Sequence, residues 1–194
     1  MTDLADRRDI ETAVYQPAED SRLLARTAAG ELAAGDRVLE VGVGSGWVAE
    51  RLAAVGGDVV GSDVNPHACR AAADRGVPVV RANLMDPFRA DAFDLVCCNP
   101  PYLPRDERAA RDDWMERALS GGEHGRAVVE PFLADLSRVL APGGVGVLLV
   151  STLTDVDAVT DAAAAAGLDA TTLAAESHPF ETLVVLGLRH AGRA

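Results

Sequence analysis

The sequence contains no lysine, few aromatic side chains and no long apolar run. Phenylalanine, tryptophan and tyrosine make up 4% of its 194 residues, so a core has to be built mainly from valine, leucine and alanine. No apolar stretch approaches the ~20 residues that a helix needs to cross a bilayer, which argues against a membrane protein. With 48% hydrophobic residues, the chain is nevertheless long enough for one α/β domain with a full core.

Cysteine and histidine are also scarce, and neither occurs at the spacing of a metal site. The cysteines are Cys69, Cys97 and Cys98, and no pair forms a C-x-x-C sequence. Cys97 and Cys98 are neighbours in an expected strand, where successive side chains point to opposite faces. We therefore predict that the cysteines are buried as small apolar residues and that the chain holds no metal.

Basic residues are few, and all 18 of them are arginines, against 30 acidic residues and a net charge of −12. Such self-repulsion destabilises a compact chain unless salt screens it, and the Debye length falls to ~3 Å at 1 M salt. The composition therefore favours a halophilic source. It also argues against broad binding to a phosphate backbone, so no direct nucleic-acid partner is expected. The first residues lack a signal-peptide pattern, which predicts a cytoplasmic protein.

Strand-like and helix-like segments alternate along the chain, which predicts an α/β domain over residues 1–194, with a mostly parallel sheet between helices. The expected strands are Arg37–Val41, Asp58–Ser62, Val77–Arg81, Phe93–Cys98, Val145–Val150, Leu168–Ala175 and Thr182–Leu188, the last two being candidates for a hairpin. The expected helices are Pro17–Ala33, Gly46–Ala54, Pro66–Arg75, Asp106–Leu119, Gly125–Leu140 and Asp155–Ala166. The helical segment within residues 1–34 is expected to pack on the domain. Pro78 marks an edge strand, because proline offers no N–H to a neighbour.

The tetrapeptide Asn99-Pro100-Pro101-Tyr102 follows the apolar run Phe93–Cys98, which is typical of a buried parallel strand. The two prolines cannot continue a ladder of hydrogen bonds, so they end the strand and stiffen the turn beyond it. Ligands of open α/β sheets bind at that edge, where the turn would hold Asn99 and Tyr102 in a fixed geometry. The alternative is that the prolines merely end a strand.

The chemistry that suits this turn is transfer to a planar NH₂ group. The side-chain carbonyl of Asn99 and the backbone carbonyl of Pro100 are two acceptors with no donor between them, and they can hold both hydrogens of an amide or an exocyclic amine. Such a nitrogen is a poor nucleophile because its lone pair is delocalised. Gripping its N–H groups favours the charge that builds up in the transition state. Tyr102 offers a face on which a planar group can lie.

A glycine-rich turn, Gly42-Val43-Gly44-Ser45-Gly46, joins the Arg37–Val41 strand to the next helix. Glycines let the backbone approach a ligand closely and adopt positive φ. Dinucleotide-binding folds use a similar loop, and the residues from Gly44 to Ala49 even fit G-x-G-x-x-A. Glu40 separates the two possibilities, because a carboxylate there repels a pyrophosphate but can hold the ammonium group of S-adenosylmethionine.

Further polar residues follow the second and third strands. A carboxylate at Asp63 can accept hydrogen bonds from both ribose hydroxyls. The alternative is that Asp63 caps the following helix, a role that Asn65 can fill instead. The amide of Asn83 can bond an adenine amine while Leu84 covers the ring, and a plain turn residue is the alternative for Asn83.

The glycine turn preceded by Glu40, Asp63 after the second strand and the tetrapeptide at Asn99 together resemble class I S-adenosylmethionine-dependent methyltransferases. The chain is most similar to the HemK-like protein-glutamine methyltransferases, in their archaeal and eukaryotic branch. Three stretches carry this resemblance: Tyr15-Gln16-Pro17-Ala18-Glu19-Asp20-Ser21, Gly121-Gly122-Glu123-His124-Gly125-Arg126 and Glu181-Thr182-Leu183.

The resemblance implies a Rossmann-like, seven-stranded sheet in the order 3-2-1-4-5-7-6 with an antiparallel last strand. It implies S-adenosylmethionine as methyl donor, S-adenosylhomocysteine as product, and as substrate the glutamine in the Gly-Gly-Gln motif of a translation termination factor. The residues implied to contact the cofactor are Ser21, Glu40, Gly42, Gly44, Gly46, Asp63, Asn83, Leu84 and Asn99. Those implied to hold the glutamine amide are Asn99, Pro100, Pro101 and Tyr102, with Asn99, Pro100 and Tyr102 as catalytic residues.

The resemblance also implies a partner, because related enzymes work with a small zinc-binding activator subunit that adds a strand to the edge of the third strand. The apolar run Val77–Arg81 suits such an addition, and the alternative is an edge covered by a loop.

Other functions remain open from the sequence. An adenine-N6 methyltransferase acting on DNA or RNA would use the same tetrapeptide on a base flipped out of its stack. A nicotinamide-binding oxidoreductase is disfavoured by Glu40. A catalytically silent scaffold subunit is disfavoured because Glu40, Asp63 and Asn99 occur together.

Overall fold

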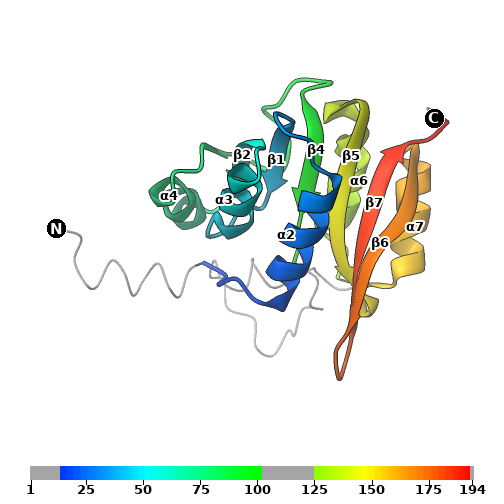
Figure 1. The fold of residues 1–194 in the computed structure, drawn as a ribbon. Helices are drawn as coiled ribbons and strands as arrows, with labels where there is room; N and C mark the ends of the chain where they lie inside the picture. The colour runs from blue at the N-terminus through cyan, green and yellow to red at the C-terminus, as the bar shows by residue number, and fades with distance from the viewer. Residues whose placement is uncertain (1–13, 102–124, 193–194) are drawn as a thin grey trace.

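The computed structural model describes residues 14–101 and 125–192, and its elements are labelled as in Figure 1. The helices in these ranges are α2 (Glu19–Glu31), α3 (Trp47–Ala54), α4 (Pro66–Asp74), α6 (Val129–Val139) and α7 (Val156–Ala165), with a 3₁₀ turn, η1 (Thr152–Thr154). The strands are β1 (Arg37–Val41), β2 (Asp58–Asp63), β3 (Val79–Arg81), β4 (Phe93–Cys98), β5 (Leu140–Ser151), β6 (Leu168–Ser177) and β7 (Thr182–His190).

The strands form one seven-stranded sheet in the order β3-β2-β1-β4-β5-β7-β6, as expected. The pairs from β3 through β5 are parallel, whereas β7 runs antiparallel to both β5 and β6. The hairpin and the edge position of β3 are thereby confirmed. From β1 the chain adds β2 and then β3 on one side of β1, and it adds β4 and β5 on the other side. The strand order therefore reverses between β1 and β4. Ligands of such sheets bind at the carboxyl ends of these two strands.

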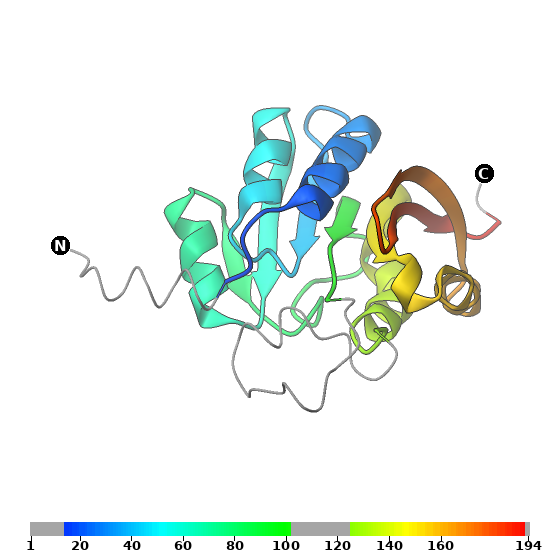
Figure 2. The ribbon, with the colours of Figure 1, turned by 90° about the horizontal axis from the view of Figure 1, so that it is seen from below.

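Two apolar clusters cover the two faces of the sheet, and helices lie on both sides of it (Figure 2). On one face, α2 and α3 pack on β1 and β4; on the other, α6 and α7 pack on β4 and β5. Cys97 belongs to the first cluster and Cys98 to the second, which confirms that they are buried on opposite faces. The predicted burial is wrong for Cys69, which is only half-buried on α4. The N-terminal helix α2 is part of the core, because Leu23, Leu24 and Ala28 are fully buried.

The main error in the predicted elements concerns the segment before and within β5. The helix expected over Gly125–Leu140 begins only at Val129, and β5 begins at Leu140 rather than Val145. The expected break at residues 141–144 is instead an irregularity inside the strand. Phe93 pairs with Leu140 and Leu95 pairs with Val145, so the register between β4 and β5 shifts over these residues. A Cβ on Gly144 would lie 3.1 Å from the carbonyl oxygens of Phe93 and Asp94, so glycine allows this close passage.

The remaining elements match the predictions to within a few residues at their ends. The strand expected from Val77 is shorter and begins at Val79, because Pro78 offers no N–H to the ladder. The helix predicted over Asp106–Leu119 lies outside the described residues.

Candidate active site

A cavity of about 310 Å³ opens at the carboxyl ends of β1, β2 and β4, where the reversal of strand order predicts a ligand site. The predicted site residues that line it are Ser21, Glu40, Gly42, Gly44, Asp63, Asn83, Leu84, Asn99, Pro100 and Pro101. The structure therefore brings together residues from five separate stretches of the chain. Gly46 is not among the lining residues, and Tyr102 lies outside the described part of the chain.

Glu40, near the end of β1, is only 4% exposed. Its Oε2 accepts a hydrogen bond of 2.7 Å from the backbone N–H of Ala49, in the first turn of α3. Burial raises the pKa of Glu40 to about 8, and the charge of Asp63 adds to this rise while the Ala49 N–H opposes it. A buried carboxylate is costly to ionise without a cation nearby. The Glu40 side of the cavity is therefore suited to a positively charged group.

Asp63, at the end of β2, is hydrogen-bonded to the glycine turn. Its Oδ2 accepts from the N–H of Gly44 at 3.0 Å, and its Oδ1 accepts from the N–H of Asn65 at 2.8 Å. Burial raises the pKa of Asp63, and these two N–H groups oppose the rise. The N-cap of α4 is Asn65, whose Oδ1 accepts from the N–H of His67 at 2.9 Å. The capping alternative for Asp63 is therefore wrong, and its carboxylate borders the cavity.

The glycine turn adopts the left-handed backbone that the sequence predicts. Gly42, Gly44 and Gly46 have φ values of +71°, +51° and +78°. A Cβ on Gly42 would meet nothing within 4 Å, whereas a Cβ on Gly46 would lie 2.8 Å from the Cα of Ala72. Gly46 thus lets α3 approach α4 closely, a packing role that the sequence reading does not anticipate.

The segment after β3, which borders the cavity, is fixed by hydrogen bonds to its backbone carbonyls. Leu84 has a φ of +48°, and its carbonyl accepts from Ser62 Oγ at 3.0 Å. Arg138 of α6 donates to the carbonyl of Met85 at 3.1 Å and to the carbonyl of Phe88 at 2.5 Å. Asn83 is exposed at the edge of this segment, where it borders the cavity. Its surroundings permit contact with a ligand.

Asn99 follows β4 directly and shows the most informative geometry in the cavity. Its Nδ2 donates to Asp20 Oδ2 at 3.0 Å. Its Oδ1 is buried and has no hydrogen-bond partner within residues 14–101 and 125–192. Buried polar atoms without partners are rare in folded proteins, so this oxygen is a candidate acceptor for a ligand N–H.

Asp20 also lines the cavity; the sequence places it in the stretch Tyr15–Ser21 but assigns it no role in the chemistry. It is 4% exposed and accepts four hydrogen bonds, from Tyr15 Oη, the N–H and Oγ of Ser21, and Asn99 Nδ2. A signal for its burial does exist in the sequence, because Asp20, Leu24 and Ala28 follow one another at the four-residue spacing of a buried helix face.

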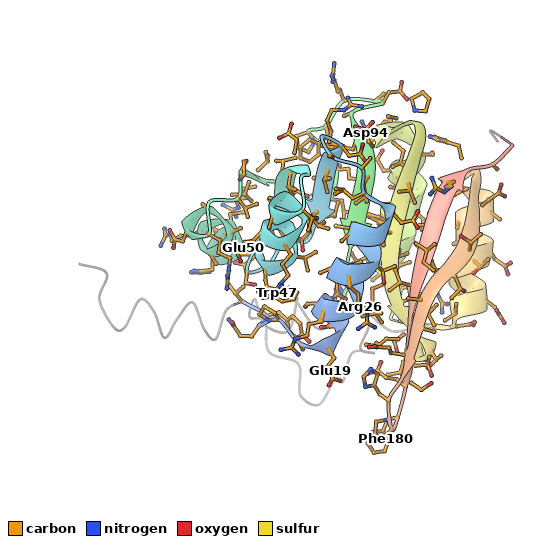
Figure 3. All side chains as sticks on the ribbon, viewed as in Figure 1. Glu19, Arg26, Trp47, Glu50, Asp94 and Phe180 are labelled. Carbon is orange, nitrogen blue, oxygen red and sulfur yellow. The ribbon has the colours of Figure 1, made fainter. Side chains whose placement is uncertain are left out.

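The β6–β7 hairpin borders the same end of the molecule. Figure 3 shows Phe180 at its tip and Glu19 at the start of α2, both at the end opposite Asp94. His178 Nδ1 lies 3.2 Å from Glu19 Oε2, and Ser151 Oγ donates to Glu181 Oε2 at 2.5 Å. The hairpin is therefore fixed against α2 and the end of β5.

Within residues 14–101 and 125–192, no group of three or more metal-ligating side chains occurs, and the cysteines are free thiols. In the same ranges, no helix combines the length and the apolar character that a bilayer crossing requires.

Comparisons with known proteins find similar sequences and a similar fold. A family model described as a methyltransferase domain matches residues 39–108. A protein of Methanocaldococcus jannaschii named as an N5-glutamine methyltransferase is 32% identical over 180 residues, which cover 89% of this chain and 90% of that protein. The human methyltransferase HEMK2 is 31% identical over 188 residues, with 89% and 88% covered.

A solved structure shows the same architecture. It is the E. cuniculi Mtq2–Trm112 complex, described as responsible for methylation of the eRF1 translation termination factor. It matches with a TM-score of 0.77 and 27% sequence identity, over 92% of this chain and 99% of that one.

Proposed function

Because the chain belongs to the HemK-type protein N5-glutamine methyltransferases, we propose that it methylates the side-chain nitrogen of a glutamine in a translation termination factor. The target is the glutamine of a Gly-Gly-Gln motif. The observation that carries the proposal is the buried, unpartnered Oδ1 of Asn99 in a cavity that also contains Glu40 and Asp63.

Asn99 and Pro100 serve as the two acceptors for the glutamine NH₂ group. Among the described residues, the Oδ1 of Asn99 lacks a hydrogen-bond partner, and the carbonyl of Pro100 follows it at the cavity wall. Both oxygens become better partners as positive charge develops on the nitrogen, so they stabilise the transition state more than the ground state. Pro101 and Tyr102 complete the substrate side of the site, with the ring of Tyr102 stacking on the planar amide.

The methyl donor is S-adenosylmethionine, whose sulfonium supplies an electrophilic methyl group and which leaves as S-adenosylhomocysteine. The cavity fits this group, because the buried carboxyl of Glu40 and the half-buried carboxyl of Asp63 match a ligand with an ammonium and a ribose. We assign the ammonium to Glu40, the ribose hydroxyls to Asp63, and the adenine to Asn83 and Leu84. Ser21, Gly42, Gly44 and Asn99 complete the cofactor side. Gly46 acts through the packing of α3 rather than by contact.

The second candidate is an adenine-N6 methyltransferase, since an exocyclic amine presents the same two hydrogens. The net charge of −12 disfavours it, because a nucleic-acid backbone would be repelled. We therefore propose a protein substrate and, since termination factors act with ribosomes, a cytoplasmic location.

The decisive experiment is transfer of a labelled methyl group to purified termination factors, DNA and RNA, at low salt and at molar salt. Label is expected in the termination factor alone, and it should vanish when the motif glutamine is replaced by asparagine. Label in adenine, with none in protein, would contradict the proposal. Higher activity in molar salt is expected for a halophilic chain of this charge.

We also propose a small, zinc-binding activator subunit on the β3 edge. The edge is short and apolar, and Val64 and Val80 beside it are 48% and 37% exposed. A partner strand pairing there would cover both valines.

Val80→Glu is expected to weaken binding of this subunit by ~10-fold or more, because the variant places a charge in the covered surface. Co-purification and a titration of the two subunits measure the effect. Val55→Glu, at a 56% exposed valine that follows α3, is the matched control and should leave binding unchanged. Equal binding by the two variants would exclude this edge.

A further inference from the structure

The side-chain amide of Asn99 has two ends of nearly the same shape but opposite hydrogen-bonding character. The oxygen accepts hydrogen bonds and the NH₂ group donates them, so a half turn about the last side-chain bond would invert what the cavity meets. With oxygen toward the cavity, the site suits an amide nitrogen. With nitrogen toward the cavity, it suits a carboxylate.

Asp20 decides between these orientations. A carboxylate only accepts hydrogen bonds, so the atom of Asn99 that lies 3.0 Å from Asp20 Oδ2 has to be the nitrogen. The oxygen is then the remaining end, and it is the buried atom that has no hydrogen-bond partner in the part of the chain that the structure describes. Turning the amide over would set an oxygen against the carboxylate and lose the charge-assisted bond.

Asp20 is itself held in place from other directions. Its Oδ1 accepts from the N–H of Ser21 at 2.6 Å and from Ser21 Oγ at 3.2 Å, and its Oδ2 also accepts from Tyr15 Oη at 3.1 Å. Burial, followed by the charge of Asp20, raises the pKa of Tyr15 to about 12. The phenol therefore stays protonated, and remains a hydrogen-bond donor, at neutral pH. A carboxylate with these contacts has little freedom to turn.

We propose that Asp20 is a positioning residue that locks the Asn99 amide with its oxygen toward the substrate, and that it thereby selects glutamine over glutamate. This inference rests on the proposed function and deepens it. Glutamate has the size of glutamine but offers oxygens where the site needs N–H groups. It would leave Asn99 Oδ1 unpaired and facing a carboxylate, a mismatch that polar sites reject strongly.

The test compares binding of two peptides, one with Gly-Gly-Gln and one with Gly-Gly-Glu, to the full chain with S-adenosylhomocysteine. The wild-type protein is expected to prefer the glutamine peptide by ~100-fold or more. In Asp20→Asn, the new amide can accept or donate, so Asn99 can turn over. The preference is then expected to fall by ~10-fold. In a separate methyl-transfer assay with S-adenosylmethionine and the glutamine peptide, the variant should lower kcat more than it raises KM.

Glu19→Gln is the matched control, because it removes the neighbouring charge from a side chain that contacts His178 rather than Asn99. It should leave the glutamine preference unchanged. A role limited to stability would lower the melting temperature of Asp20→Asn without altering the preference, and that result would overturn the proposal.

A second measurement covers the case in which Asp20→Asn does not fold. In ¹⁵N-labelled wild-type protein, the side-chain NH₂ of Asn99, assigned by its loss in Asn99→Ala, is expected to show one set of signals with slow solvent exchange. Two sets of signals or fast exchange would contradict the lock. Should the wild-type protein methylate no termination factor, the proposed function fails, and the orientation of Asn99 is judged by this spectrum alone.

Discussion

Asn99→Ala is expected to lower kcat for the termination factor by ~10²- to 10³-fold while the affinity for S-adenosylhomocysteine changes by less than ~5-fold. The variant removes the buried acceptor that would grip the glutamine nitrogen, but it leaves Glu40 and Asp63 in place for the cofactor. Single-turnover methyl transfer and calorimetric titration with S-adenosylhomocysteine measure the two quantities separately.

The same variant leaves Asp20 without one of its donors, so a small loss of stability has to be separated from the loss of chemistry. The hydrogen bond between Asn99 and Asp20 is partly buried, and removing one partner of such a bond costs ~1–3 kcal/mol, which thermal unfolding will register. Asn83→Ala is the matched control at the other end of the cavity, and it should raise the KM for the cofactor rather than lower kcat. Near-normal turnover by Asn99→Ala, in folded protein, would show that the mechanism is wrong.

Glu40→Gln is expected to weaken binding of S-adenosylhomocysteine by roughly 100-fold, because the variant removes the buried charge assigned to the ligand ammonium. In the free protein the pKa of Glu40 is about 8, so the carboxyl is mainly protonated at neutral pH. Binding of a cation requires the ionised form. The affinity of the wild-type protein, relative to that of Glu40→Gln, is therefore expected to rise from pH 6 to pH 8 and to level off above it.

Calorimetric titration from pH 6 to pH 8 measures the affinity for S-adenosylhomocysteine of both proteins. The amino group of the ligand also titrates, but it affects both affinities equally and cancels in their ratio. Binding at pH 7 should also release protons to the buffer in the wild-type protein but not in the variant. A pH-independent ratio would exclude Glu40 as the ammonium partner.

The stability of the ligand-free protein is expected to move in the opposite direction. The pKa of Glu40 is raised in the folded state, so the folded chain binds more protons than the unfolded chain between about pH 4.5 and about pH 8. This contribution to stability is fully present below that range and is lost as the pH rises through it. At pH 8, ligand-free Glu40→Gln is therefore expected to be more stable than the wild type, on the order of a few kcal/mol. Thermal unfolding at pH 6 and pH 8 measures the gain.

Much of the site could be predicted because its residues follow strands. Glu40, Asp63 and Asn99 come at the carboxyl ends of strands that the apolar pattern identifies, and parallel strands bring such ends to one edge of the sheet. The order of the strands came from the resemblance rather than from periodicity, because local patterns do not report which strands are neighbours.

The features that were missed depend on contacts between distant segments. The hydrogen bond between Asp20 and Asn99 joins residues 79 positions apart, and an acidic residue in a first helical turn ordinarily indicates a favourable interaction with the helix dipole. The continuation of β5 through Pro142 and Gly143 was missed for a related reason. Proline and glycine usually end a strand or helix. Here they lie inside β5, at the point where its register with β4 shifts.

The helix α2 contributes both to the core and to the cavity. Leu24 and Ala28 fill the interior, and two surface ion pairs, Arg26 with Glu176 and Arg189 with Glu31, attach the helix to the last two strands. One turn before Leu24, the same helix supplies Asp20. If Asp20 orients the Asn99 amide as we propose, the packing of this one helix links the stability of the core to the geometry of the cavity.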